Sequence, residues 1–191
     1  EYEFGDKNSK IKIAVLDLGC KKSILKNFSE RGALCKVFPA KTTYDKMCKW
    51  NPDGFFISNG PGDPASMDYA VNTVREILKN DRPIFGICLG HQLLALAAGG
   101  HIEHMPYGHR SHNQPVTIAG SKKGYITCQN HSYMVNKHSL PSDWQVWFHN
   151  LNDQTVEGIK HASKPFCSIQ FHPEAAGGPR DTAWILSQFI S

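Results

Sequence analysis

A short motif near the middle of the chain, G-I-C-L-G at residues 86–90, constrains the fold most strongly. It lies between an apolar run at 83–87, typical of a buried strand, and a run at 93–98, typical of a helix. Glycines two residues before and after a reactive side chain are the pattern of a sharp strand-to-helix elbow that exposes a nucleophile, here cysteine instead of serine. The backbone turns too tightly for neighbouring Cβ atoms, so both glycines are needed. The motif predicts that Cys88 stands at a helix N-terminus.

This position gives Cys88 two chemical advantages. The helix dipole and the free N–H groups favour a thiolate over a thiol, and the N–H of Leu89 is placed to bind an oxyanion. The alternative is a structural cysteine packed at a strand end, because free cysteine is among the most buried residue types. A partner base decides between these interpretations.

The first half of the chain alternates strands and helices. Apolar runs predict strands at 12–17, 33–38, 54–58 and 83–87, with helices over 22–32, 44–50 and 65–79 between them. This alternation predicts an α/β fold with a central, mostly parallel sheet flanked by helices. The sequence contains no G-x-G-x-x-G after the first strand and no phosphate-binding G-x-x-x-x-G-K-[ST], so no nucleotide site is argued from glycine loops.

A rigid loop, N-G-P-G-D-P at 59–64, follows the third predicted strand. Open α/β sheets bind ligands at the carboxyl ends of their strands, so the N–H groups of this loop are candidates to hold a substrate or an oxyanion. A plain turn between strand and helix is the alternative.

The second half changes character after residue 100. Short β-type runs at 114–118, 124–128, 145–148, 155–160 and 166–171 predict a mixed or antiparallel extension of the sheet, and 181–190 predicts a closing amphipathic helix. The polar residues 1–10 are interpreted as a lead-in or linker, and 11–191 as one domain.

Composition excludes several classes of function. The net charge is only +4 and the lysines are scattered, so neither a nucleic acid nor a membrane is predicted as a partner. No apolar stretch reaches the roughly 18 residues of a membrane span. The six cysteines stand singly, which favours reduced thiols in a cytoplasmic protein over a disulfide framework or a zinc site.

Four of the ten histidines crowd into one segment: His101, His104, His109 and His112. Pro106, Gly108 and Arg110 lie among them and indicate a loop, not a helix face with ligand spacing. No metal site is therefore predicted there.

A base for Cys88 is found at the end of the last predicted strand. His172 and Glu174 leave that strand two residues apart, so their side chains can lie on the same side of the chain. A cysteine nucleophile needs a base and a third group that orients it, and these two residues fit both roles.

The motifs at residues 86–92 and 170–174, occurring together in this order, resemble those of the class I (triad) glutamine amidotransferases. The resemblance to this family covers nearly the whole chain. The segments 58–64, 108–116 and 129–131 look like the glutaminase domain of the carbamoyl-phosphate synthetase small subunit, more than its counterparts in anthranilate or GMP synthesis. The resemblance implies that Cys88 attacks the side-chain amide of L-glutamine and forms a thioester. His172 would serve as base and acid, and Glu174 would hold its imidazole.

The resemblance also implies a substrate site and a partner. The backbone of Gly60 and Leu89 would form the oxyanion site, and glutamine would be bound at Gly62, Gln92, Asn130, Ser132 and Tyr133. Ammonia would pass to a carbamoyl-phosphate synthetase large subunit that uses ATP and bicarbonate, and no cofactor is expected in this chain.

Two departures from the family stand out. Ser132 occupies a position where the family usually has glycine, which is tolerable if only its backbone touches glutamine and its dihedral angles suit a Cβ. The N-terminal domain of the family's small subunit is not part of these 191 residues, so the chain is expected to be a fragment beginning at the linker or a free-standing domain. Three alternatives remain: a silent regulatory or interaction domain, a cysteine hydrolase of γ-glutamyl compounds, and a glutaminase of another pathway.

Overall fold

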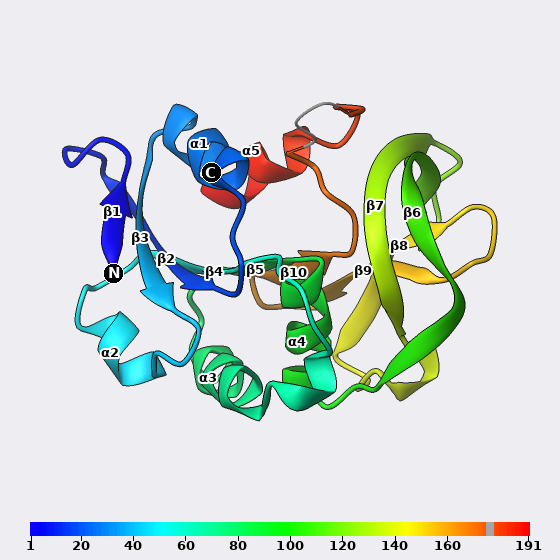
Figure 1. Ribbon diagram of the computed structural model, residues 1–191, viewed down its shortest axis with the longest axis horizontal. Helices are drawn as coiled ribbons and strands as arrows, with labels where there is room; N and C mark the ends of the chain where they lie inside the picture. Colours follow the sequence, from blue (N-terminus) through cyan, green and yellow to red (C-terminus); the bar gives the residue numbers. More distant parts are fainter. Residues whose placement is uncertain (175–177) are drawn as a thin grey trace.

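The computed structural model describes residues 1–174 and 178–191, which form one ten-stranded sheet with helices on both faces (Figure 1). The strand order is β1-β3-β2-β4-β5-β10-β9-β8-β6-β7. The strands are β1 (Tyr2–Phe4), β2 (Ile11–Asp17), β3 (Ala33–Pro39), β4 (Gly54–Ile57), β5 (Ile84–Ile87), β6 (Ile102–Ile118), β7 (Gly124–Val135), β8 (Trp144–Asn150), β9 (Val156–His161) and β10 (Phe166–Ile169). The helices are α1 (Lys22–Glu30), α2 (Tyr44–Cys48), α3 (Asp68–Leu78), α4 (Leu89–Ala98) and α5 (Trp184–Ile190), with short 3₁₀ turns at Pro64–Ser66 and Lys137–Ser139.

The centre of the sheet is parallel. Strands β3, β2, β4, β5 and β10 pair in parallel, and β1 and β9 flank them in antiparallel pairs. Helices α1 and α5 cover one face, and α2, α3 and α4 cover the other (Figure 1). Each face has its own buried apolar cluster, so the central strands are apolar on both sides. The predicted α/β class is confirmed.

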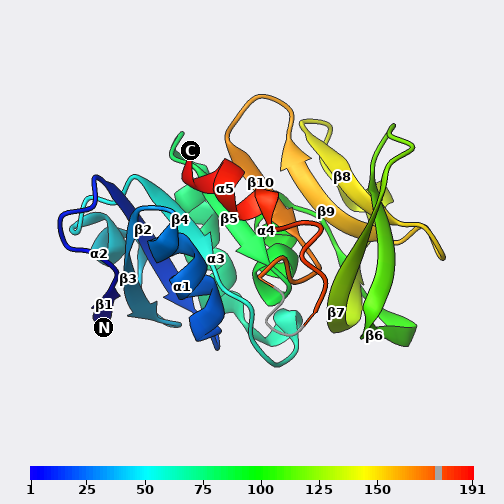
Figure 2. The same ribbon diagram turned by 90° about the horizontal axis from the view of Figure 1, so that it is seen from above.

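The mixed extension is confirmed as well, but one segment was predicted wrongly. Residues 101–112, interpreted as a loop, lie mostly within β6, which pairs with β7 in a long twisted hairpin at one end of the molecule (Figure 2). The pairing shifts register between His104 and His109, and again between Ser111 and Gln114. These irregularities accommodate Pro106 and Gly108, residues that would interrupt a regular ladder.

Smaller differences concern element ends. The helix predicted from residue 65 begins at Asp68, because the Asp63 carboxylate accepts the Ala65 N–H and caps a separate 3₁₀ turn. The last helix begins at Trp184 instead of 181. In the segment interpreted as a lead-in, Tyr2–Phe4 add an edge strand to β3.

Candidate active site

The predicted elbow joins β5 to α4. Cys88 immediately precedes α4 and has a φ of +54°, a conformation that costs energy for any residue with a side chain. A Cβ on Gly90 would collide with the carbonyl oxygen of Ile57, and a Cβ on Gly86 would lie 2.7 Å from the backbone of Gly90. Close backbone approach therefore requires both glycines, and the strained turn presents Cys88 at the carboxyl end of the sheet.

His172 follows β10, the strand next to β5. Its backbone N–H donates to the carbonyl oxygen of Cys128 at 3.0 Å, which ties the residue to β7. The imidazole Nδ1 lies 2.7 Å from Oε1 of Glu174. Burial alone would lower the pKa of His172, but its interactions with Cys88 and Glu174 prevail and raise that pKa to about 9. The ring therefore carries a proton at neutral pH.

Glu174 lies behind His172 and is almost fully buried. Burial would raise its pKa, yet the hydrogen bond and charge of His172 reverse this and hold the pKa below its ordinary value. Lys21 Nζ lies 3.6 Å from the same Glu174 oxygen, and its side chain is half exposed. The carboxylate is thus kept charged beside the imidazole.

A cavity of about 680 Å³ opens in front of Cys88 and His172. Its volume is in the range of small-molecule sites. Every residue predicted for the site lines this cavity except Glu174, which orients His172 from behind. The lining residues from the prediction are Gly60, Gly62, Cys88, Leu89, Gln92, Asn130, Ser132, Tyr133 and His172.

Two backbone N–H groups are candidates for the oxyanion site. Leu89 is the first residue of α4, so its N–H has no partner within the helix. Gly60 belongs to the loop after β4, and a Cβ there would collide with the carbonyl oxygen of Leu18. Only glycine allows this loop to approach so closely, as its composition suggested.

The strand β7 forms the opposite wall. Cys88 Sγ points toward the carbonyl oxygen of Asn130 at 4.0 Å. Ser132 does not have a positive φ, so its Cβ causes no backbone strain at the family's glycine position. Its hydroxyl accepts a hydrogen bond from the guanidinium of Arg110 on β6.

Sequence reasoning missed several lining residues: Gly19, Lys21, Asn59, Pro61, Asp63 and His131. Asn59, Pro61 and Asp63 belong to the loop whose composition made it a candidate ligand site, with a plain turn as the alternative. Lys21 carried no such signal, because only the folding of the chain brings it to Glu174.

Among the described residues, no helix is long and apolar enough to cross a membrane.

Residues 14–191 match the family model "Glutamine amidotransferase class-I". The chain is 47% identical over 181 residues to the carbamoyl phosphate synthase small chain of Clostridium acetobutylicum, covering 94% of this chain and 51% of that protein. It is 50% identical over 180 residues to the arginine-specific small chain of Debaryomyces hansenii, covering 93% and 42%. The chain thus spans about half the length of the curated relatives it matches.

A solved structure supports the fold independently. A putative GMP synthase protein of Thermoplasma acidophilum superposes with a TM-score of 0.79, and the match covers 94% of each chain. At 23% identity this likeness concerns the fold alone.

Proposed function

Because the chain belongs to the class-I glutamine amidotransferase family, we propose that it hydrolyses L-glutamine to glutamate and ammonia and supplies the ammonia to a carbamoyl-phosphate synthetase large subunit. One observation carries the proposal most directly. A cysteine on a strained elbow shares a cavity with an imidazole that a buried carboxylate holds at 2.7 Å.

In the first half-reaction, the Cys88 thiolate attacks the side-chain carbonyl carbon of glutamine and forms a C–S bond. The negative charge that develops on the carbonyl oxygen is bound by the N–H groups of Leu89 and Gly60. His172, protonated at rest, gives its proton to the departing nitrogen as the C–N bond breaks. Ammonia leaves, and a glutamyl thioester remains on Cys88.

In the second half-reaction, the neutral His172 takes a proton from water while the water oxygen attacks the thioester. The C–S bond breaks, and glutamate leaves with the thiolate restored. The Glu174 carboxylate holds the imidazole in one orientation throughout and stabilises its charged form.

The partner is proposed from the names of the relatives. Proteins named carbamoyl phosphate synthase small chain match 93–94% of this chain in organisms as different as Clostridium acetobutylicum and Debaryomyces hansenii. No cofactor is needed for the two half-reactions above, and ATP and bicarbonate would be used by the large subunit.

The proposal is tested by measuring glutamate release from glutamine, with and without a carbamoyl-phosphate synthetase large subunit. We expect release that depends on Cys88, increases with that subunit, and falls by on the order of 10⁴-fold in Cys88→Ser. A diazoketone analogue of glutamine provides a second readout, because it should alkylate Cys88 even when turnover is slow. Cys35→Ser is the matched control, since Cys35 is buried in the sheet.

The outcomes separate the alternatives. Release at the parent rate in Cys88→Ser would exclude the triad mechanism. A folded chain that neither releases glutamate nor is alkylated is a silent domain. Hydrolysis of γ-glutamyl compounds in preference to glutamine, without stimulation by the large subunit, would indicate an independent hydrolase.

A further inference from the structure

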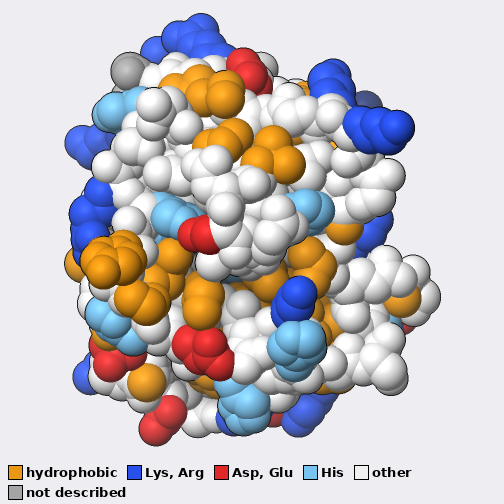
Figure 3. Space-filling model, turned by 90° about the vertical axis from the view of Figure 1, so that its right-hand side faces the viewer, with side chains coloured by type: hydrophobic (Ala, Val, Ile, Leu, Met, Phe, Trp, Pro, Cys, Tyr) orange, Lys and Arg blue, Asp and Glu red, His pale blue; other side chains and the backbone are white. Residues whose placement is uncertain are grey.

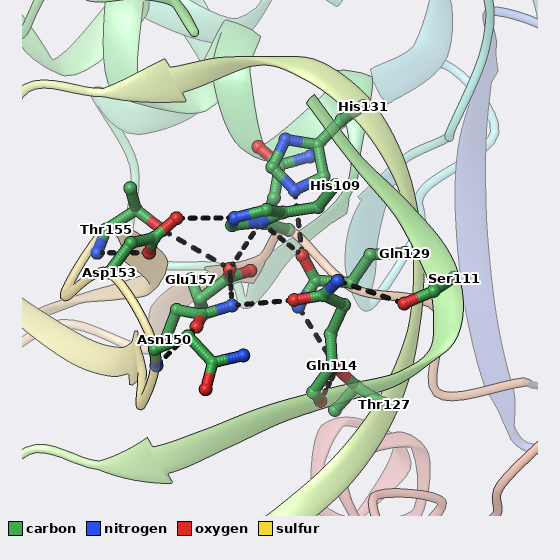
Figure 4. A network of polar contacts seen from close by, with 12 residues as sticks. His109, Ser111, Gln114, Thr127, Gln129, His131, Asn150, Asp153, Thr155 and Glu157 are labelled. Atoms are coloured by element: carbon green, nitrogen blue, oxygen red, sulfur yellow. Dashed lines mark hydrogen bonds and ion pairs between the residues drawn. The ribbon is translucent and has the colours of Figure 1, made fainter. Parts of the chain in front are cut away.

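A second cluster of ionisable side chains is formed by residues of the strands β6, β7 and β9 (Figure 4). His109 comes from β6, His131 from β7 and Glu157 from β9, and all three are buried. One nitrogen or oxygen of each lies within 4.8 Å of the others. The active-site mechanism uses none of these side chains.

The outward-facing nitrogen of each imidazole already has a partner. His109 Nε2 lies 2.6 Å from the Asp153 carboxylate, and His131 Nδ1 lies 2.8 Å from the carbonyl oxygen of Tyr133. The other nitrogens, His109 Nδ1 and His131 Nε2, therefore face inward. An imidazole that donates its remote N–H to a carboxylate or a carbonyl is the usual outer support of a metal ligand.

Among the inward-facing atoms, hydrogen-bond acceptors outnumber the N–H donors that could pair with them. A carbonyl only accepts, so a neutral His131 spends its single N–H on Tyr133. Its Nε2 lone pair then faces the side-chain oxygen of Gln129 at 2.8 Å, another acceptor. Without a metal, burial would lower the pKa of His109, but the Glu157 and Asp153 carboxylates prevail and raise that pKa to about 9. A second proton on His131 would therefore place two positive rings side by side, with ring centroids 4.9 Å apart.

Turning the Gln129 amide does not relieve this conflict. Its Nε2 donates to Thr127 Oγ1 at 3.1 Å, and that hydroxyl gives its own proton to the carbonyl oxygen of Gln114 at 2.7 Å. Exchanging the two ends of the amide would place two acceptors together at Thr127. In the described part of the chain, the buried Oε2 of Glu157 also has no hydrogen-bond partner.

We propose that His109 Nδ1, His131 Nε2 and the Glu157 carboxylate bind a divalent transition-metal ion of the zinc type. Two imidazoles and one carboxylate form a ligand set that zinc accepts, and the Gln129 oxygen, 2.9 Å from His109 Nδ1 and 2.8 Å from His131 Nε2, is the candidate for a fourth ligand. With the ion bound the charges balance, because the divalent cation replaces the proton on His109 Nδ1 and offsets the Asp153 and Glu157 carboxylates beside two neutral imidazoles.

The distances require only local adjustment. Ligand atoms on one tetrahedral zinc lie roughly 3.3 Å apart, given metal–ligand bonds of about 2.0 Å. His109 Nδ1 and Glu157 Oε1 are 3.1 Å apart, and the widest spacing in the cluster stays within 4.8 Å. His131 is among the residues that line the active-site cavity, so the cluster borders that cavity. Figure 3 shows the surface of the molecule at the end where β6, β7 and β8 lie. Histidine and acidic side chains are seen there among apolar ones.

A metal here would join three strands next to the substrate wall. His131 is adjacent to Asn130, whose carbonyl oxygen faces Cys88, so the ion would fix β7 against β6 and β9. The role is structural, and the proposal does not depend on glutamine hydrolysis.

The test counts zinc bound to the untagged, chelator-treated chain by equilibrium dialysis against ZnCl₂ and elemental analysis. It uses a Cys88→Ser background, because the Cys88 sulfur together with His172 would otherwise offer zinc a second binding site. We expect one zinc per chain and visible absorption from bound Co²⁺. Glu157→Gln, which keeps the acceptor for Asn150, should abolish zinc binding. Asp153→Asn should weaken it by about 10–100-fold, as for other outer supports.

His112→Ala is the matched control, since His112 is an exposed histidine of the same strand. It should bind zinc like the parent. Circular dichroism verifies that each variant is folded. If Glu157→Gln unfolds the chain, Asp153→Asn still tests the proposal, because the partly exposed position of Asp153 tolerates substitution. The proposal is overturned if the folded chain binds no zinc, or if Glu157→Gln and Asp153→Asn bind it as tightly as the parent does.

Discussion

The side-chain amide of Gln92, on the first turn of α4, donates a hydrogen bond of 3.0 Å to the side-chain oxygen of Gln170, which directly follows β10. Both side chains are buried. The bond joins the helix that begins after Cys88 to the strand that delivers His172. The same Gln92 nitrogen lies 3.3 Å from the carbonyl oxygen of Tyr133, so the Gln92 oxygen is the group left to face a substrate in the cavity.

This pair predicts an asymmetric effect on stability. Gln170→Leu leaves the buried Gln92 amide without its best acceptor, and we expect a loss of about 1–3 kcal/mol in the free energy of unfolding. The double variant Gln92→Leu with Gln170→Leu should recover part of that loss, because neither partner then remains unpaired. Urea unfolding of the parent, the two single variants Gln92→Leu and Gln170→Leu, and the double variant measures the coupling between the two side chains. Strictly additive losses would show that the hydrogen bond contributes nothing.

The parallel half of the fold was predictable because its signals are local. Strands of four to seven mostly apolar residues alternate with amphipathic helices, and the two glycines around Cys88 specify the elbow within five residues. The prediction of a loop at residues 101–112 was wrong for the opposite reason. Pro106 and Gly108 suggest a loop locally, whereas pairing with β7 makes the segment a strand.

The candidate site divides along the same line. Cys88, His172 and Glu174 lie in two short motifs, so the sequence alone was enough to single them out as candidates. The contact of Lys21 with Glu174 joins residues more than 150 positions apart, and the cluster of His109, His131 and Glu157 draws on three strands. Spacing along the chain carries no information about such contacts.

The elbow itself is testable through its second glycine. In Gly90→Ala the added Cβ collides with the Ile57 carbonyl, so β4 or α4 must shift. We expect a loss of about 3 kcal/mol or more in the free energy of unfolding, and loss of glutamate release. Gly124→Ala is the control, because a Cβ there meets Leu151 at an ordinary 3.4 Å. That variant should be stabilised by about 0.5–1 kcal/mol. Equal effects of the two variants on the urea midpoint would contradict the close-approach argument.

Replacing Ser132 tests whether its side chain or only its backbone contacts glutamine. Its φ is ordinary and its hydroxyl is occupied by Arg110, so Ser132→Gly should change the KM for glutamine by less than about threefold, or ~0.6 kcal/mol. Gln92→Leu removes the oxygen that faces the cavity and should raise KM by about tenfold or more, or ~1.4 kcal/mol. Steady-state glutamate release measures both. A large rise in KM for Ser132→Gly would assign the hydroxyl a direct contact with glutamine.

The charged state of His172 predicts the alkaline limit of the reaction. The ring is surrounded by Cys88, Glu174 and, farther away, Lys21 and His131, and its pKa is raised from 6.5 to about 9. A raised pKa means that the charged ring stabilises the fold fully below pH 6.5 and loses that contribution as the pH rises through about 9. The proton given to the leaving ammonia is lost over the same range. We therefore expect kcat/KM for glutamate release to fall above pH 9.

Glu174→Gln identifies the source of that limit. The amide cannot stabilise the imidazolium as a carboxylate does, so the pKa of His172 should fall and the alkaline limb should move to lower pH. The rate at neutral pH should also drop, on the order of 10³–10⁴-fold if the carboxylate acts like the orienting acid of other triads. Lys21→Gln, which removes a half-exposed cation near the same carboxylate, should leave the rate within about tenfold, because exposed ion pairs contribute little. If the alkaline limb stays in place in Glu174→Gln, the limit belongs to a group other than His172.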